Sequence, residues 1–375
     1  MYHRFISLLS LLPVALGAAL GPRNSSTTST ACNNSPDLCS RSYSNITQLG
    51  AHDSPFLRDA STGYSSSGNQ LVNTTLQLDA GVRLLTAQAH DNNGALHLCH
   101  TSCSLLDAGP LSSWLAEIKS WMDKNPNDVV TILVVNSDGA TANTLHQQFV
   151  AADITQYTYT PPQTTAAIKV WPTLQSLIAN NTRLITFVAD IDPSTTQAAN
   201  AQYLLNEFTF VFENPFENTS ATNFSCVPDR PLAVRGETSE AVATGRLSLV
   251  NHFLDISLAF GIAVPDIANA HLTNANSGVV GNLGDSAKAC ATAFGKQPNF
   301  LLVDFFDQGN AIETVDKLNG ITPVGRTDVS GLTDAQKGLS NAGSGRIGLL
   351  GGSFKTSTGL LVLVGVGVQI LMALS

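Results

Sequence analysis

Runs of apolar residues recur through the middle of the chain, and segments with helical periodicity separate them. The longest run is Val129–Val135, and shorter runs lie at Val82–Leu85, Leu184–Val188, Leu247–Val250 and Phe300–Val303. Short, almost continuous apolar runs are typical of strands that are buried on both faces. We therefore predict a sheet whose two faces are both covered.

One segment between these runs has a clear amphipathic pattern. From Leu111 to Met122 the apolar residues fall on a single helical face: Leu111, Trp114, Leu115, Ile118, Trp121 and Met122. Further helices are expected at Thr196–Asn206 and Ala311–Leu318. Strands that alternate with helices predict a parallel sheet, and over residues 45–325 we expect an α/β fold, a single irregular (β/α) barrel of the TIM type. An open doubly wound sheet is the alternative, although no G-x-G-x-x-G follows a predicted strand.

The N-terminus carries the basic residue Arg4, a short apolar stretch and small residues at A-x-A-like spacing. This pattern predicts a secretory signal peptide over residues 1–19. A first transmembrane helix is the alternative, but the stretch is shorter than the roughly 20 residues that a span needs. Residues 20–44 are rich in Ser, Thr and Asn, and we expect them to form an exposed leader.

The C-terminus ends in a second apolar stretch, which no basic cluster follows. Small residues, a spacer and a terminal apolar tail form the pattern of glycosylphosphatidylinositol (GPI) attachment. We predict a stalk over residues 326–345, attachment at Asn341 with Gly343 and Ser344 as rivals, and removal of the tail, residues 346–375. A tail-anchored transmembrane helix is the alternative. The expected location is outside the cell, on the plasma membrane or the cell wall.

Composition narrows the classes of partner. Hydrophobic residues make up 43% of the chain, charged residues 13%, and the formal net charge is −9. A nucleic-acid partner is not expected, because phosphate backbones are bound by Lys and Arg patches. We expect a monomer without a cofactor. Seven N-x-[ST] sequons predict surface glycosylation, at Asn24, Asn33, Asn45, Asn73, Asn180, Asn218 and Asn223.

Six cysteines in a secreted chain favour disulfide bonds. Their order along the chain suggests the pairs Cys32–Cys39, Cys99–Cys103 and Cys226–Cys290, although other pairings remain open. A zinc site at Cys99 and Cys103 is the weaker interpretation, because no second cysteine pair has a matching spacing.

Polar residues gather where the predicted strands end, which is where barrel enzymes keep their active sites. They are His52, Asp53, His100, Asn136, Asn251 and Asp304. Two histidines suit general acid–base catalysis, because imidazole gives or takes a proton near neutral pH. A lone histidine would be interpreted as structural, whereas several polar strand ends together favour a site.

The same residues carry a family resemblance. Gly50–Ser54 resembles the first histidine motif of the phosphatidylinositol-specific phospholipase C X-domain superfamily, and Leu96–His100 resembles its second histidine strand. Gly81–Leu85, Asn125–Asn136 and Leu301–Phe305 resemble other barrel units of that superfamily, the last with its terminal aspartate. The resemblance extends from about Asn45 to Gly320, and the chain is most similar to the secreted fungal branch of phospholipase-C-like phosphodiesterases.

The resemblance implies roles for four residues. His52 would be the general base that draws a proton from an inositol hydroxyl, and His100 would be the general acid that protonates the departing oxygen. Asp304 would orient His52, and Asp53 would support His100. The substrate would be a phosphoinositide or a related phosphodiester, and the products a cyclic phosphodiester and a diacylglycerol-type lipid.

One position departs from the family pattern. Active bacterial members carry an arginine, and calcium-dependent members carry acidic metal ligands, where this chain has Thr86-Ala87-Gln88. Gln88 has no charge, and losing a cation there would cost on the order of 10²–10³ in rate. We expect Gln88, Asn136 and Asn251 to contact the substrate, and no metal to bind. The chain is then either a metal-independent phosphodiesterase or a weak or inactive surface protein that uses the barrel for binding.

Overall fold

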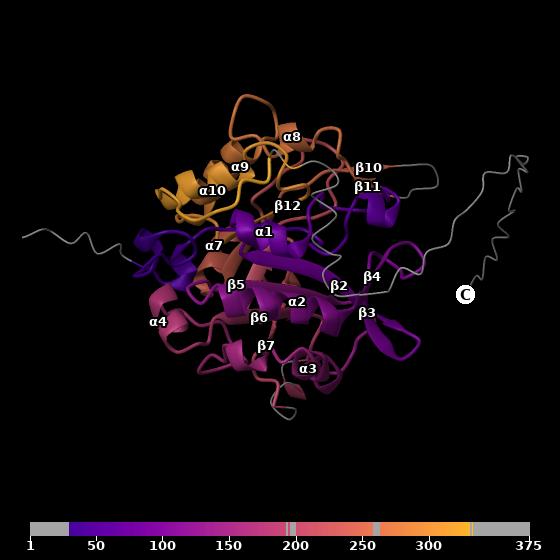
Figure 1. Ribbon diagram of the computed structural model, residues 1–375. Helices are drawn as coiled ribbons and strands as arrows, with labels where there is room; N and C mark the ends of the chain where they lie inside the picture. The colour runs from indigo at the N-terminus through magenta and orange to yellow at the C-terminus, as the bar shows by residue number, and fades with distance from the viewer. Residues whose placement is uncertain (1–29, 193, 196–199, 258–262, 331, 333–375) are drawn as a thin grey trace, which may run out of the picture.

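Eight parallel strands form one curled sheet (Figure 1). The computed structural model describes residues 30–332 except 193, 196–199, 258–262 and 331. The strands are β1 (Gln48–Ala51), β2 (Leu84–Asn92), β5 (Val130–Asn136), β6 (Leu184–Ala189), β7 (Leu204–Asn206), β8 (Val211–Glu213), β9 (Leu247–Asn251) and β12 (Phe300–Val303). Their order is β7-β6-β5-β2-β1-β12-β9-β8, so the first and last strands of the chain lie side by side. The predicted α/β barrel architecture is confirmed.

Side chains alternate between the inside of the barrel and its outer face, as the period of a strand requires. In β2, Leu84 belongs to the interior core and Leu85 to the outer one, while Thr86 and Gln88 line an interior cavity. The interior core includes large side chains from several strands, among them Leu133, Phe187, Leu249, Phe300 and Leu302. Gly50 is needed beside them, because a Cβ would lie 2.8 Å from Leu302 and 2.9 Å from Leu84.

Helices cover the outer face of the sheet (Figure 1). Two were predicted: α2 (Leu111–Lys124), which buries the whole predicted apolar face, and α10 (Ala311–Asn319). The others are α1 (Thr74–Ala80), α3 (Ala142–Ala151), α4 (Leu174–Ala179), α6 (Glu207–Phe210), α7 (Thr238–Ala243), α8 (Ala270–Thr273) and α9 (Leu283–Phe294). Short 3-10 turns lie at η1 (Pro36–Leu38), η2 (Tyr43–Asn45), η3 (Ala60–Thr62), η4 (Thr155–Tyr157) and η5 (Leu232–Val234).

The predicted helix at Thr196–Asn206 is wrong at its end. Leu204–Asn206 is strand β7, which pairs with β6 in parallel. Pairing with a neighbouring strand outweighs the helical pattern of so short a segment. Residues 196–199 lie outside the described residues.

The barrel is irregular at one place, which we call the seam. β7 pairs with β6, and β8 pairs with β9, but no backbone ladder joins β7 to β8 in the part of the chain that the structure describes. The short helix α6 connects the two strands instead. The interior cavity is lined by Ala189 of β6, Glu207 of α6 and Glu213 of β8, so side chains complete the ring where hydrogen bonds do not.

Two antiparallel extensions stand beyond the carboxyl ends of the barrel strands. β2 continues into β3 (Ala95–Cys99) and β4 (Asp107–Pro110), and β10 (Asp255–Ser257) pairs with β11 (Ala263–Pro265). Figure 1 shows both on the right side of the molecule, and the indigo N-terminal segment and α4 on the left. The carboxyl and amino-terminal ends of the barrel are therefore covered by different parts of the chain.

Residues 30–44 belong to the folded domain and are not an exposed leader. Cys32, Leu38 and Tyr43 are buried in the interior core. The Tyr43 hydroxyl forms a 2.7 Å hydrogen bond with Thr131 Oγ1 of β5. The predicted domain boundary at residue 45 is too late, because the amino-terminal end of the barrel needs this segment to cover its apolar side chains. Residues 20–29 lie outside the described residues.

A buried ion pair holds the same segment in place. Arg83 Nη2 lies 2.6 Å from Asp128 Oδ1 and donates a 2.6 Å hydrogen bond to Asn34 Oδ1. Near the other end of the chain, Arg326 pairs with Asp316 at 2.7 Å, so the first residues of the predicted stalk also pack on the domain. Removing one partner of such a pair would leave the other charge buried and unpaired.

The three disulfides have the predicted pairing, Cys32–Cys39, Cys99–Cys103 and Cys226–Cys290. The predicted signal peptide, Asn24, Asn341 and the C-terminal tail lie outside the described residues. Within the described ranges, no helix combines the length and the apolar character that a membrane span requires.

Candidate active site

A cavity of about 260 Å³ opens at the carboxyl ends of the barrel strands. Leu133, Leu249 and Leu302 of the interior core line part of it. Two polar groups of residues reach it. We call His52, Asp53, His100 and Asp304 the histidine cluster, and Glu207, Glu213, Arg230 and Asn251 the carboxyl cluster.

His52 follows β1 and is held from several sides. Its Nδ1 lies 2.9 Å from Asp304 Oδ1, and Asn69 Nδ2 donates a 3.0 Å hydrogen bond to the same oxygen. The imidazole stacks on Phe253, with ring centroids 3.9 Å apart and an angle of 8° between the planes. Because Asp304 accepts from Nδ1, Nε2 is the nitrogen that can exchange a proton with a substrate. His52 lines the cavity and its side chain is 22% exposed.

His100 reaches the site from a hairpin and not from a barrel strand. β2 runs past the barrel, and the chain then returns as the antiparallel strand β3, which ends directly before His100. His100 Nε2 lies 3.7 Å from Asp53 Oδ2, and His52 Nε2 lies 3.8 Å from the same oxygen. The structure therefore brings the two predicted histidines together around one carboxylate.

Gln88 contacts protein groups with both ends of its amide. Its Nε2 donates a 2.7 Å hydrogen bond to Asp53 Oδ2, and its Oε1 accepts a 3.0 Å hydrogen bond from the backbone N–H of Thr101. We expected this side chain to contact the substrate. It lines the cavity, but its polar atoms are occupied in holding Asp53 and the loop after β3.

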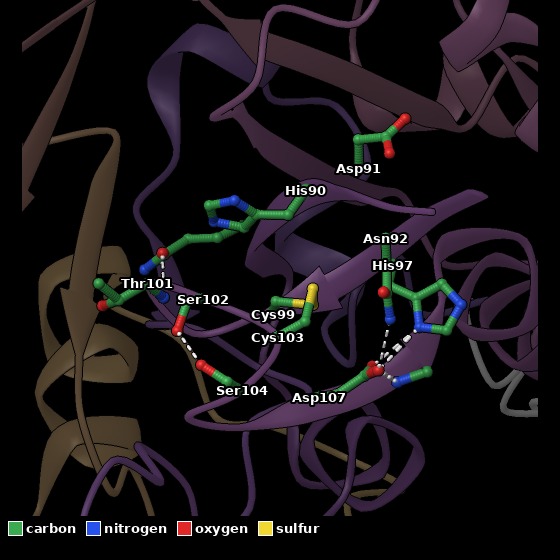
Figure 2. The surroundings of a disulfide bond; sticks show 12 residues. His90, Asp91, Asn92, His97, Cys99, Thr101, Ser102, Cys103, Ser104 and Asp107 are labelled. Carbon is green, nitrogen blue, oxygen red and sulfur yellow. Dashed lines mark hydrogen bonds and ion pairs between the residues drawn. A yellow bond between two sulfur atoms is a disulfide. The ribbon is translucent and has the colours of Figure 1, made fainter. Parts of the chain in front are cut away.

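The loop that carries His100 is closed by the Cys99–Cys103 disulfide (Figure 2). His100 N–H donates to Leu106 O at 2.9 Å, and Thr101 has a left-handed φ of 60°. Figure 2 also shows His97 turned toward Asp107, whose carboxylate lies 2.9 Å from His97 Nδ1, on the outer hairpin. The disulfide and the Gln88 contact together restrict the backbone that positions His100.

The two histidines have opposite pKa shifts. Burial opposes the charge on His52, but the carboxylates of Asp53 and Asp304 outweigh burial and raise its pKa to about 9. Burial lowers the pKa of His100, and the Asp53 carboxylate only partly offsets it. Near neutral pH, His52 is therefore the protonated histidine and His100 the neutral one.

Of the carboxyl cluster, only Asn251 was identified from the sequence. Glu213 lies at the end of β8, and its carboxylate forms an ion pair with Arg230 Nε and accepts a 2.9 Å hydrogen bond from Asn251 Nδ2. Arg230 also lies over the ring of Phe216, 4.5 Å from its centroid. Within the described part of the chain, Arg230 is the one Lys or Arg side chain in the cavity lining.

Burial dominates the titration of this cluster. It raises the pKa of Glu207 well above the usual range, and the nearby Glu213 raises it further. Burial also raises the pKa of Glu213, and Arg230 and Asn251 partly offset this rise. Asp255, on β10 beyond the histidine cluster, has a pKa raised to about 6 by burial and by the Asp304 carboxylate. The cavity thus contains Glu207 and Glu213, whose raised pKa values favour the protonated form, together with one paired arginine, Arg230.

Asn136 and Asn251 differ in position. Asn251 lines the cavity, as expected of a substrate contact. Asn136 does not: its Nδ2 donates to Ala140 O at 2.9 Å and its Oδ1 accepts from Ala140 N at 2.8 Å, so the side chain closes the turn after β5. Throughout the described residues, no group of three or more His, Cys, Asp or Glu side chains is arranged to hold a metal ion.

The sequence of the chain matches a known family. Residues 38–319 match the family described as PI-PLC X. The chain belongs to the PI-PLC X family.

The relatives include two proteins from the fungus Arthroderma benhamiae. The chain is 38% identical over 292 residues to its "PI-PLC X domain-containing protein 1", covering 77% of this chain and 90% of the relative. It is 35% identical over 302 residues to an "Uncharacterized secreted protein", covering 79% of this chain and 65% of that protein. An Arabidopsis thaliana "PI-PLC X domain-containing protein" is 25% identical over 264 residues, and the chain spans 55% of its length.

Solved structures of bacterial enzymes are more distant. Phosphatidylinositol-specific phospholipase C from Listeria monocytogenes is 15% identical, with a TM-score of 0.47 over 75% of this chain and 95% of that one. A Staphylococcus aureus phosphatidylinositol-specific phospholipase C structure, the F249X mutant, is 13% identical, with a TM-score of 0.48 over 74% of this chain and 94% of that one.

Proposed function

We propose that this protein is a phosphodiesterase that cleaves a lipid phosphodiester of an uncharged polyol, such as phosphatidylinositol, without a metal ion. The observation that carries the proposal is the single carboxylate oxygen of Asp53, within 4 Å of Nε2 of both His52 and His100, beside a cavity lined by both polar and apolar side chains. Two imidazoles at one site can take a proton from one oxygen and give a proton to another.

The proposed roles follow from which histidine lines the cavity. A polyol headgroup would occupy the cavity, where it would face His52, and the lipid alcohol would face outward toward His100. His52 Nε2 would accept the proton of a polyol hydroxyl as its oxygen bonds to phosphorus. The bond from phosphorus to the lipid oxygen would break, and His100 would protonate that oxygen. The products would be a cyclic phosphodiester and a diacylglycerol-type alcohol.

The proton count sets a condition on this cycle. The reaction needs His52 neutral and His100 protonated, whereas the pKa shifts place the resting proton on His52. After each turnover the proton is again on His52, so solvent exchange must take that proton from His52 and return one to His100 before the next turnover. The reactive form is a minority near neutral pH, which predicts a slow enzyme.

The carboxyl cluster gives the proposed headgroup its chemical class. Sugar and polyol hydroxyls both donate and accept hydrogen bonds, and Glu213, Asn251 and Arg230 offer acceptors and donors at the cavity. A headgroup with further phosphates would meet the Asp53 carboxylate, which disfavours added negative charge, and buried acidic side chains that offer it no cation. We therefore favour a headgroup without extra phosphates.

The direct test is product formation from vesicles of phosphatidylinositol. Phosphorus NMR should show a cyclic phosphodiester released by the purified protein in the presence of a chelator, and not by His52→Ala or His100→Ala. Phosphatidylinositol 4,5-bisphosphate should be cleaved more slowly. The mechanism would be contradicted if release required calcium. It would also be contradicted if both histidine variants released as much product as the unchanged protein.

A second candidate function is binding without turnover. It is favoured by the occupied amide of Gln88 and by the pairing of Arg230 with Glu213, which leave no unpaired Lys or Arg charge among the described cavity residues. Under this alternative, the protein would retain an inositol phosphodiester in equilibrium dialysis and form no product over days.

We also propose that the protein is secreted and GPI-anchored, on the basis of the predicted signal peptide and the tail pattern near Asn341. The related protein described as secreted supports the first part. Mass spectrometry of the mature C-terminal peptide tests the second part: a peptide that contains Leu360–Leu374 would contradict the anchor.

A further inference from the structure

The fold divides the predicted glycosylation sites into two classes. Six of the seven sequons lie in the described residues. Three of their asparagines are buried: Asn33, Asn73 and Asn218. The other three are exposed: Asn45, Asn180 and Asn223. The sequence motif is the same in both classes, so only the structure separates them. An N-linked glycan is attached to Nδ2, and that atom must therefore reach solvent in the folded protein.

The buried asparagines are built into the fold. Asn33, 5% exposed, donates from Nδ2 to Val129 O at 3.2 Å and accepts from Val129 N–H at 2.7 Å, next to the Cys32–Cys39 disulfide. Asn218, 4% exposed, donates from Nδ2 to Pro215 O at 3.1 Å. A glycan on either nitrogen would replace one of its two hydrogens and would need space that the surrounding chain fills.

Asn73 is buried by a different contact. Its side-chain oxygen caps α1 by accepting from Leu76 N–H at 2.9 Å, and the residue is 2% exposed. A cap of this kind contributes about 1 kcal/mol to a helix. A glycan on Nδ2 would need space beside the capping oxygen, where the surrounding chain covers the residue almost completely.

The exposed asparagines lie in surface turns. Asn45 directly precedes the segment that enters β1, and Asn180 follows α4, so both lie at the amino-terminal end of the barrel. That end is on the left in Figure 1, away from the β2–β3–β4 extension. Asn223 lies in the loop between β8 and η5, on the side where the strands end.

We propose that the secreted protein carries N-linked glycans at Asn45, Asn180 and Asn223 and none at Asn33, Asn73 or Asn218. The inference rests on the proposed secretion and not on the catalytic proposal. A lipid pyrophosphate-linked oligosaccharide would be the donor: its bond from sugar C1 to the phosphate oxygen breaks, a bond from C1 to Nδ2 forms, and Nδ2 loses a proton. A chain modified at a buried site would not complete the fold and would not be secreted.

The test is glycopeptide mass spectrometry of the full chain, secreted from a fungal host under its own N-terminus, after enzymatic deglycosylation in heavy-oxygen water. Heavy-oxygen aspartate is expected at positions 45, 180 and 223 and unmodified asparagine at positions 33, 73 and 218. Occupancy at any of these last three in monomeric, folded protein would overturn the division. Secreted protein without any glycan at Asn45, Asn180 and Asn223 would overturn it as well, while leaving secretion intact.

Matched variants give a second measurement. Asn45→Asp, Asn180→Asp and Asn223→Asp should each lower the mass of the secreted protein by one glycan, because aspartate keeps the shape but cannot accept the sugar. Asn73→Asp is the control: it keeps the capping oxygen and should leave the glycan mass unchanged. A loss of one glycan in Asn73→Asp would contradict the proposal, even if a buried variant such as Asn33→Asp fails to fold.

Discussion

The histidine cluster and the carboxyl cluster reach the same cavity, but they are built in different ways. His52 and Asp53 directly follow the short parallel strand β1, Asp304 directly follows β12, and Asp304 contacts His52 across these adjacent strands. Glu207 and Glu213 flank the seam, and the arginine that pairs with Glu213 comes from a loop outside the strands. The histidine cluster therefore takes three of its four residues from the ends of paired barrel strands, and His100 from a hairpin. The carboxyl cluster takes Glu213 and Asn251 from the paired strands β8 and β9, Glu207 from the seam, and Arg230 from a loop that forms backbone hydrogen bonds with Glu213. The difference suggests separate duties, proton transfer for the first and headgroup binding for the second.

The largest effect should come from the imidazoles. His52→Ala and His100→Ala should each reduce the turnover rate on phosphatidylinositol by about 10²–10⁴, because each removes one proton-transfer group. The double variant should be little worse than either single variant, since the two act in one step. Turnover rates and the melting temperature of each variant check this. Additive losses in the double variant would indicate that the two residues act separately.

A substitution in the carboxyl cluster should change binding more than turnover. Glu213→Gln removes a buried carboxylate and leaves Arg230, whose side chain is 37% exposed, without its partner. We expect KM to rise by at least about tenfold, with a smaller change in kcat. Asp285→Asn, which changes an exposed carboxylate on α9, is the matched control. An unchanged KM and a large fall in kcat for Glu213→Gln would remove the proposed division of duties.

The pH dependence tests the histidine cluster without a change of size. The form with one proton on the pair predominates between the two pKa values, so kcat/KM should fall with acid below the lowered pKa of His100 and with base above about 9. Asp304→Asn removes a carboxylate that raises the pKa of His52, so the alkaline limb should move to lower pH. An alkaline limb that stays near 9 in Asp304→Asn would show that another group controls it.

The smallest effect should come from Gln88. Gln88→Leu loses the hydrogen bonds to Asp53 and to the Thr101 backbone, each with a net contribution of about 1 kcal/mol. A loss of roughly tenfold in kcat with little change in KM would indicate a positioning role for this side chain. A rise in KM alone would instead support the original expectation that Gln88 binds substrate.

Much of the histidine cluster could be predicted from the sequence, because His52 stands in the Gly50–Ser54 motif and Asp304 ends the apolar run Phe300–Val303. The run Phe208–Phe212, which ends at Glu213, gave the same kind of signal and was missed. Arg230 gave no signal, since its place depends on how a loop returns to Glu213. The assignment of Asn136 to the substrate site failed because a strand-end amide can equally well close its own turn.

The domain limits show a similar division. The barrel strands and α2 follow from local periodicity, which the chain displays residue by residue. The packing of residues 30–44 could not be predicted from their Ser, Thr and Asn content, because it depends on Tyr43 and Leu38 meeting apolar side chains from distant strands. The disulfide pairs were accessible from their order, since two of the three link cysteines that are adjacent along the chain and close in sequence.

The barrel should open most easily at the seam between β7 and β8. Seven of the contacts around the ring are backbone ladders, which resist separation of the strands, whereas at the seam only side chains and α6 resist it. Thermal opening should therefore concentrate at Leu204–Glu213, and amide hydrogens there should exchange faster than those of β5 or β2. Because Glu207 and Glu213 belong to this segment, the width of the cavity and the separation of its two carboxyl groups would vary together. A headgroup bound between Glu207 and Glu213 would hold the two sides of the seam together and slow the exchange of these amide hydrogens.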